Sequence, residues 1–407
     1  MTSPKKLTRD LYLLIAFDAF RAVSDLFLGA FFVAFVMQLS ANEIVSVSAY
    51  KLFEYVATCA GFFLFANWVK RYNKVVVFAF NLLPKILILL SIIILGNAAI
   101  HYVIPLGMLY GISAALYHLP RHAMTIDKVP SRQMGHFIGT KNAIGYMAKI
   151  IAPVALGCFI DATSYVEIAY VLLFFALLEI LLVCLMTPCR HRSNAPVDFR
   201  GFFRCMMRFP VVRKLFVIEL FRGFSLQLLV TVIAMYTVYI FKTDLNLGIL
   251  TTVFSLCSVA TCWLMRYMRL AKSYRWALWI SAWLIFVSML LFVCNATPVT
   301  FLLYNLVYAT AVVFVDQVDT TNVYRLSKTS CITQDNRVEY FVFRDFALFI
   351  GRWIGFTGLM YVGVFGGYDW LRWYLVVICV ALIAWCVLSA GLLRHRNRAQ
   401  DTQKPVS

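Results

Sequence analysis

Charged residues are scarce in this chain: they make up 14% of its 407 residues, whereas hydrophobic residues make up 62%. Soluble domains are about half apolar, and the core of a soluble fold of this length could not enclose so much apolar surface. Long polar segments are also lacking, because short polar breaks separate apolar runs of about 20 residues, the length of a membrane-spanning helix. The composition excludes a soluble fold and predicts a multi-pass membrane protein surrounded by lipid.

Several signatures of other protein classes are missing. The 11 cysteines include no C-x-x-C pair, so we interpret them as small apolar side chains rather than a metal or redox site. There is no glycine-rich phosphate loop, and the loops are too short for a nucleotide-binding domain. His122 and Asp127 have the spacing of an acyltransferase base pair, but the loop 121–137 is too short to hold an acceptor site. We expect no enzymatic activity, no cofactor and no metal.

The apolar runs predict an all-α membrane protein, because a helix satisfies all of its own backbone hydrogen bonds in lipid. Leu11–Met37 is too long for a cleaved signal sequence and carries three charges, so we interpret it as the first span. The twelve predicted spans are 11–37, 44–66, 75–96, 99–120, 138–160, 165–187, 214–240, 247–265, 276–295, 299–320, 339–363 and 370–393.

Basic residues are distributed unevenly between the predicted loops. The chain has 37 Lys and Arg against 19 Asp and Glu. Of the basic residues, 27 fall in the two termini and the loops on the same side, two on the other side and eight within spans. Because positive loops stay in the cytoplasm, the pattern predicts cytoplasmic termini in a cell inner (plasma) membrane. It also leaves no basic patch for nucleic acid.

The two halves of the chain resemble each other. Asp18-Ala-Phe-Arg21 in the first span matches Glu219-Leu-Phe-Arg222 in the seventh, at an offset of 201. Lys141 and Lys149 in the fifth span match Arg344 and Arg352 in the eleventh, at an offset of 203, and Tyr110 and His118 match Tyr308 and Asp316, at an offset of 198. Such near-constant offsets indicate a parallel internal repeat, which is typical of secondary transporters.

With this repeat, its twelve spans and a basic central loop, the chain resembles the major facilitator superfamily. Gly61 and the basic segment 66–74 resemble part of the family's loop signature, although Asn67 stands at its acidic position and its second glycine is missing. The resemblance implies two six-helix bundles, 1–187 and 214–407, joined by a cytoplasmic basic linker, 188–213. It also implies a cavity lined by spans one, four, seven and ten, with spans two, five, eight and eleven beside them.

Charged side chains within spans are the candidate functional residues, since each is costly in lipid unless it is paired or hydrated. Structural pairing between helices is the alternative interpretation, and we apply it to Lys85 and Glu179. The predicted proton-coupling and substrate-cavity residues are Asp18, Arg21, Asp25, Lys51, Glu54, Lys141, Lys149, Glu219, Arg222, Asp316, Asp319, Arg344, Asp345 and Arg352.

The first span places three of these charges on one helical face. Asp18, Arg21 and Asp25 follow an i, i+3, i+7 spacing, so one arginine serves two carboxylates. The less well paired carboxylate is a candidate for reversible protonation. Asp18 and Arg21 also resemble the proton-coupling pair of glycolipid flippases in the same superfamily. We expect Asp18 and Asp25 to face Lys141 or Lys149, and the acids of the tenth span to face Arg344 or Arg352.

These patterns predict a proton-coupled secondary transporter that moves a small polar or charged solute by alternating access, and that is monomeric. The fifth span, with Gly139, Ala148, Ala152-Pro153 and Leu156-Gly157, resembles the superfamily's antiporter signature with some glycines replaced, which favours efflux. Symport for uptake and flipping of a lipid-linked substrate stay open. A membrane receptor or scaffold that does not transport is the alternative of another class, although a scaffold gains nothing from so many buried charges.

Overall fold

The computed structural model describes residues 8–129, 134–189, 196–241, 244–265, 271–326, 332 and 336–401, and the regular elements among them are all helices. The first half of the chain contains α1 (Arg9–Leu26), η1 (Phe27–Phe31), α2 (Phe32–Leu39), α3 (Glu43–Arg71), α4 (Lys74–Ala79), α5 (Leu82–Leu95), η2 (Gly96–Tyr102), α6 (Val103–Lys128), α7 (Met134–Ala162) and α8 (Tyr165–Cys184). The second half contains α9 (Phe199–Arg208), α10 (Pro210–Arg222), η3 (Gly223–Gln227), α11 (Leu228–Phe241), α12 (Asp244–Met265), α13 (Ala271–Cys294), α14 (Pro298–Leu326), α15 (Arg337–Phe365) and α16 (Gly367–Asp401).

These helices cross the bilayer twelve times, as the sequence predicts. Eight helical segments of the described chain are long and apolar enough to span a membrane, and one of them, Lys74–Lys128, folds back at η2 to make two passes. The shorter apolar segments Ile150–Ala162, Leu245–Thr261 and Leu278–Cys294 lie within α7, α12 and α13 and supply the remaining crossings. The prediction of an all-α membrane protein with twelve spans is confirmed.

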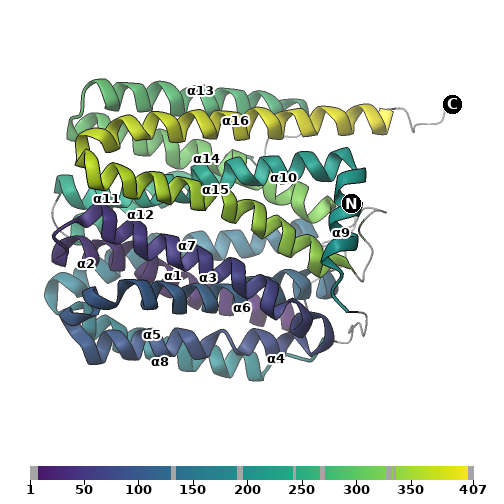
Figure 1. The fold of residues 1–407 in the computed structure, drawn as a ribbon, viewed down its shortest axis with the longest axis horizontal. Helices are drawn as coiled ribbons and strands as arrows, with labels where there is room; N and C mark the ends of the chain where they lie inside the picture. Colours follow the sequence, from purple (N-terminus) through teal and green to yellow (C-terminus); the bar gives the residue numbers. More distant parts are fainter. Residues whose placement is uncertain are drawn as a thin grey trace.

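The two halves form two six-helix bundles. In Figure 1 the helices of the first half occupy the lower part of the view, and α10, α13, α14, α15 and α16 occupy the upper part. The bundles meet where α3 packs along α15 and α7 packs along α12. The predicted linker, 188–213, includes the short helix α9, and its residues 190–195 lie outside the described part of the chain.

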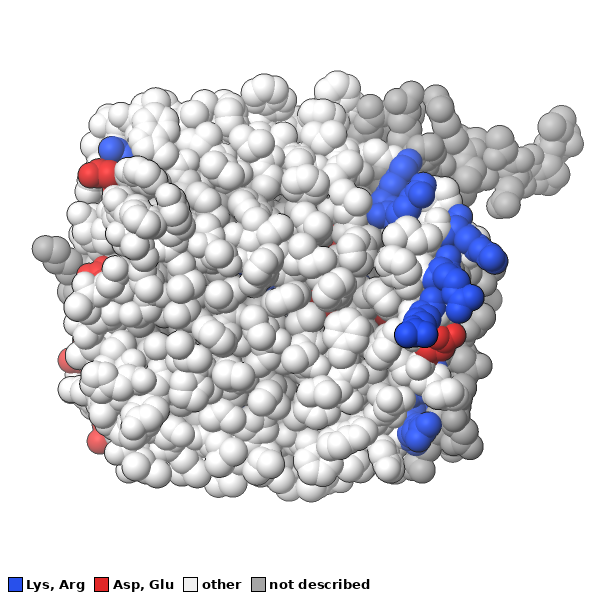
Figure 2. Space-filling model, in the orientation of Figure 1, with Lys and Arg blue, Asp and Glu red and all other residues white. Residues whose placement is uncertain are grey.

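The two ends of the bundle differ in charge. Figure 2 shows a wide surface without charge, with Lys and Arg gathered at the end where α9 lies in Figure 1. Exposed Arg71, Arg208 and Arg213 belong to this end, which we call the basic end. The opposite end carries exposed acids such as Asp161 and Asp369. An apolar belt of this kind between two polar ends matches a bilayer.

Two of the long crossings contain a π-helical turn, η1 in the first and η3 in the seventh. A π-turn adds one residue to the helix and is frequent at functional sites. Beyond η1, the residues Phe32–Met37 are all buried, because α2 packs against both α3 and α11 of the other bundle. A helix that is buried on every side lies at the centre of the fold, so the first crossing joins the two bundles at the end opposite the basic end.

Candidate functional site

A cavity of about 820 Å³ lies between the two bundles. It is lined by α1, α3, α6 and α7 of the first bundle and by α10–α11, α12, α14 and α15 of the second. At the basic end it reaches Thr125, Phe137 and Val323, each within one turn of a helix terminus. This volume is within the range of small-molecule sites.

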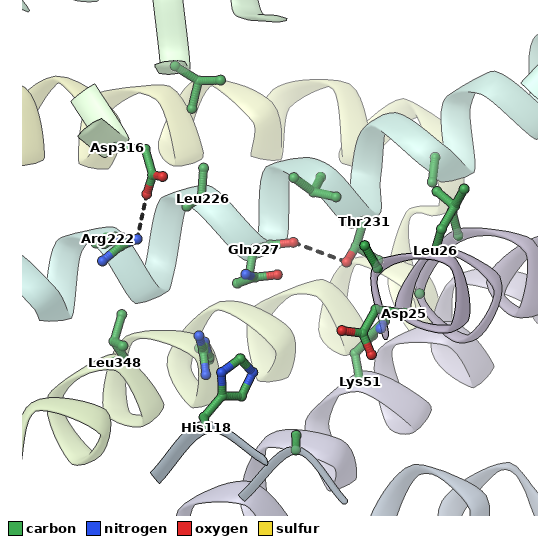
Figure 3. Close-up of a pocket in the computed structure, with 18 of the residues that line it drawn as sticks. Asp25, Leu26, Lys51, His118, Arg222, Leu226, Gln227, Thr231, Asp316 and Leu348 are labelled. Atoms are coloured by element: carbon green, nitrogen blue, oxygen red, sulfur yellow. Dashed lines mark hydrogen bonds and ion pairs between the residues drawn. The ribbon is translucent and has the colours of Figure 1, made fainter. Parts of the chain in front are cut away.

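Ten of the predicted site residues line this cavity: Arg21, Asp25, Lys51, Glu54, Lys141, Arg222, Asp316, Arg344, Asp345 and Arg352. Asp18 and Glu219 are ion-paired to arginines that line it. The side chains of Lys149 and Asp319 lie outside the described residues. Figure 3 shows Asp25 and Lys51 on one side of the cavity, with Arg222 and Asp316 on the other.

Arg21 organises the charges of the first bundle. Its Nε lies 2.7 Å from Asp25 Oδ1, and its Nη1 donates to Ser113 Oγ at 2.9 Å and to Asn81 Oδ1 at 3.2 Å. Arg21 is only 2% exposed, whereas the side chain of Asp25 is 35% exposed to the cavity and accepts from the Tyr110 hydroxyl at 3.1 Å. Arg21 is therefore fixed in the protein, and Asp25 is the member of the pair that a solute or proton can reach.

Asp18 has a partner that the sequence did not predict. Arg121 Nε lies 2.8 Å from Asp18 Oδ1, and the Tyr117 hydroxyl donates to the same oxygen at 2.7 Å. The sequence pattern predicts a loop at Arg121, but α6 continues to Lys128 and carries Arg121 into the bundle, where it is 4% exposed. Asp18 and Asp25 therefore pair with Arg121 and Arg21.

The second pair of charges in the first bundle lies on a single helix. Lys51 Nζ is 2.8 Å from Glu54 Oε2, and both side chains are buried on α3. The ammonium group also faces the rings of Tyr50 and Tyr110 at 5.1 and 5.6 Å. The i, i+3 spacing brings these two charges together within one turn of helix.

The second bundle repeats the arrangement with different partners. Glu219 is fully buried and accepts from Arg344 Nε at 2.8 Å, and Arg222 lies 3.5 Å away. Arg222 Nη2 is in turn 2.5 Å from Asp316 Oδ1 on α14 (Figure 3). The prediction that Asp316 faces Arg344 or Arg352 was wrong. Its partner is Arg222, because the side chain of Asp316 points across the cavity to α10 rather than to α15.

Sequence reasoning also missed two histidines on α6. His118 and His122 line the cavity with ring centroids 6.2 Å apart, and His122 stacks on Phe341 of the other bundle at 4.8 Å. Their four-residue spacing places both on one face of the helix, but His122 fell in the predicted loop. Among the described residues, no group of three His, Cys, Asp or Glu is arranged to hold a metal.

Ion pairs outside the cavity tie helices together. Lys85 and Glu179 pair at 2.6 Å between α5 and α8, as the structural interpretation predicted. At the basic end, Lys70 Nζ lies 2.6 Å from Glu339 Oε1 and joins α3 to α15 of the other bundle. At the opposite end, the Tyr368 hydroxyl donates to Glu43 Oε2 at 2.5 Å, again between bundles. The bundles are therefore linked on both sides of the cavity.

Comparison with known proteins identifies the fold. No protein-family model and no curated protein sequence matches the chain. Among solved structures, it is similar to a bacterial homologue of the iron transporter ferroportin in an inward-facing state, with a TM-score of 0.60 and 12% sequence identity. The match covers 96% of this chain and 100% of the other. The likeness confirms the predicted fold of twelve helices in two six-helix bundles.

Proposed function

We propose that this protein is a secondary active transporter that moves a small polar or charged solute through the cavity by alternating access. The observation that carries this proposal is the cavity itself, which lies between two repeat-related bundles and is lined by charged residues of both. Charges inside a membrane are costly unless paired or hydrated, and they commonly mark substrate and ion pathways. Transporters built from repeats place their substrate site near the bilayer midplane between the repeats.

The proposal includes proton coupling through Asp25. This carboxylate is exposed to the cavity, and its partner Arg21 is held by two further polar side chains. Protonation of Asp25 would release one contact of Arg21 without moving the arginine. We favour export by antiport, and import by symport would appear in the same assay as proton flux in the same direction as the solute.

We place the basic end, with both termini, in the cytoplasm, and the protein in an inner (plasma) membrane as a monomer. The exposed Arg71, Arg208 and Arg213 support this orientation through the positive-inside rule. The neighbour of similar fold is a homologue of an iron transporter. Here seven Lys and Arg line the cavity against four Asp and Glu, and Asp18 and Glu219 pair with two of these arginines, which leaves an excess of one basic side chain. A net positive lining repels a metal cation, so we propose an organic solute.

The test is a proton-flux assay on the full-length protein in liposomes that contain a pH-sensitive dye. Solute pools are added to one side under an imposed pH gradient. We expect solute-dependent proton flux from the wild type, loss of the flux in Asp25→Asn, and wild-type flux in Asp369→Asn, whose carboxylate is 91% exposed at the protein surface. Absence of flux with every pool contradicts the transporter proposal. Wild-type flux in Asp25→Asn contradicts proton coupling at this residue.

The non-transporting scaffold is the less well supported alternative. A scaffold does not need a lined cavity in which Asp25 and Asp316 keep 35% and 43% of their side-chain surface exposed. Flipping of a lipid-linked substrate stays open as a variant of transport. Lipid-linked pools in the same assay distinguish it from transport of a free solute.

A further inference from the structure

Arg352 differs from the other cavity arginines in having no carboxylate partner among the residues that the structure describes. Arg21, Arg121, Arg222 and Arg344 each form an ion pair with an acid. Within the described part of the chain, no carboxylate oxygen lies within 4.0 Å of the Arg352 guanidinium, and its buried Nε has no hydrogen-bond acceptor. A guanidinium is always charged and has five N–H donors, so this side chain requires an acceptor that the described residues do not supply.

The surroundings of Arg352 fix the plane of its guanidinium. The group lies over the ring of Tyr55 at 4.4 Å from the centroid, and Tyr55 also packs against Phe356 at 5.5 Å. The Tyr55 hydroxyl donates to Gln227 Oε1 at 3.1 Å, which joins α3 of one bundle to η3 of the other. Stacking on an aromatic ring leaves the edge of a guanidinium free to bind an oxyanion through two parallel hydrogen bonds.

A complementary acceptor lies on the same helix. Asp345 precedes Arg352 by seven residues, so both lie on one face of α15, about 10 Å apart along its axis. The Asp345 side chain lines the cavity and is 8% exposed, and its Oδ2 has no hydrogen-bond donor among the described residues. An unpaired buried carboxylate oxygen is as costly as an unpaired donor. The site therefore offers one donor group and one acceptor group to a ligand.

Two further polar atoms on α14 lie unpaired on the cavity wall. The Tyr308 hydroxyl and Asn305 Oδ1 are buried and have no hydrogen-bond partner among the residues that the structure describes. Together with Gln227, they give the cavity uncharged polar groups between which a solute with several oxygen or nitrogen atoms can bind. A purely apolar ligand would leave all of these groups unsatisfied.

We propose that the cavity binds a small organic anion, with its carboxylate or phosphate group on Arg352 and a hydroxyl or ammonium donor on Asp345. This inference rests on the proposed transport function and names the class of its substrate. Even with Asp18 and Glu219 counted as the partners of Arg121 and Arg344, seven basic side chains stand against six acidic ones, and this excess supports an anion. Arg352 and Asp345 are about 10 Å apart along α15. The solute must therefore span this distance with its polar ends, or reach one of the two side chains through an ordered water.

The direct test measures ligand-induced thermal stabilisation of the full-length protein in detergent, at matched ionic strength. The probes are glutamate, succinate, glycerol 3-phosphate and choline. We expect at least one of the three oxyanions to raise the unfolding temperature and choline to have no effect. Arg352→Gln is expected to weaken half-saturation by about tenfold to a hundredfold, the value of hydrogen bonds to a charged group. Arg352→Lys keeps the charge without the paired geometry and should be intermediate.

The matched control is Arg372→Gln, because Arg372 is an arginine outside the cavity lining, 3.6 Å from Asp369. This variant should respond like the wild type. Asp345→Asn should weaken the binding of glutamate and glycerol 3-phosphate more than that of succinate, which has no donor group. Stabilisation by choline alone, stabilisation by no oxyanion, or an unchanged response in Arg352→Gln overturns the inference.

The proton-flux assay separates this inference from the proposed function. If the wild type shows flux driven by a cationic solute and Arg352→Gln keeps that flux, the protein is a transporter and the assignment of an anion is wrong. If no solute drives flux in the wild type, the proposed function itself fails. If oxyanions drive flux that Arg352→Gln loses and Arg372→Gln keeps, both stand.

Discussion

Lys85 Nζ lies 2.6 Å from Glu179 Oε1 in an ion pair that is buried between α5 and α8 and does not line the cavity. Removal of one partner from a buried pair leaves an uncompensated charge, which typically costs about 3–5 kcal/mol. We therefore predict that Lys85→Met or Glu179→Gln lowers the unfolding temperature sharply, as measured by thermal unfolding in detergent.

The double variant Lys85→Met/Glu179→Gln is the control for that prediction. With both charges gone, no unpaired charge stays buried, so most of the stability should return. Transport per folded molecule should match the wild type. A double variant that is stable but inactive would assign this pair a role in transport.

The pair formed by Arg222 and Asp316 should behave in the opposite way. The Asp316 side chain is 43% exposed in the cavity, and ion pairs that water can reach contribute about 1 kcal/mol or less to stability. Asp316→Asn should therefore unfold at nearly the wild-type temperature while its transport rate falls. A large loss of stability with an unchanged rate per folded molecule would show that the pair is structural.

The ion pair of Lys70 and Glu339 links the two bundles at the basic end, and both side chains are at most 5% exposed. Glu339 Oε1 also accepts from the backbone N–H of Asp198 at 3.2 Å, next to α9. Glu339→Gln should weaken this link between the bundles. In a background without native cysteines, we therefore expect a cysteine introduced at Thr125 on the cavity wall to be alkylated faster. The charge-swapped variant Lys70→Glu/Glu339→Lys should restore part of the protection. Unchanged alkylation in Glu339→Gln would contradict a closing role.

Tyr368 and Glu43 form the corresponding link at the opposite end, where the Tyr368 ring also stacks on Tyr239 at 3.9 Å. Tyr368→Phe keeps the ring and removes one hydrogen bond to a charged acceptor, a loss of about 1.5–3 kcal/mol. In the same cysteine-free background, a cysteine at Ala30 should become more reactive toward a membrane-impermeant thiol reagent added at this end. Equal reactivity in the presence and absence of the hydroxyl would show that the bond does not hold this end closed.

The sequence predicted the number of helices and the 6+6 repeat, because these depend on apolar run length and on repeated residue spacing. The helices that line the cavity were implied by the resemblance to the major facilitator superfamily. The pair of Lys51 and Glu54 follows from spacing alone, since a three-residue spacing brings two side chains together on any helix. Arg21 and Arg222, which the repeat matches to each other, both line the cavity.

Partners on different helices could not be predicted in the same way. Spacing gives the face on which Asp18 or Asp316 lies, but the neighbour of that face depends on how the helices rotate and pack. Arg121 was missed for a different reason. The span prediction ended α6 at residue 120, where apolar residues stop, whereas a helix surrounded by protein can continue past that limit and bury a paired arginine. The orphaned groups of Arg352 and Asp345 can be recognised only once their surroundings are known.

Distances between spin labels on the two bundles test alternating access most directly. One labelled pair, at Arg71 and Arg213, uses exposed positions of the basic end, and the other, at Ala41 and Ala296, uses exposed positions of the opposite end. In the full-length protein in liposomes, a change of pH or addition of a transported solute should shorten one distance distribution while it lengthens the other. Two distributions that never change in opposite directions, under any pH or solute that supports flux, would contradict the account.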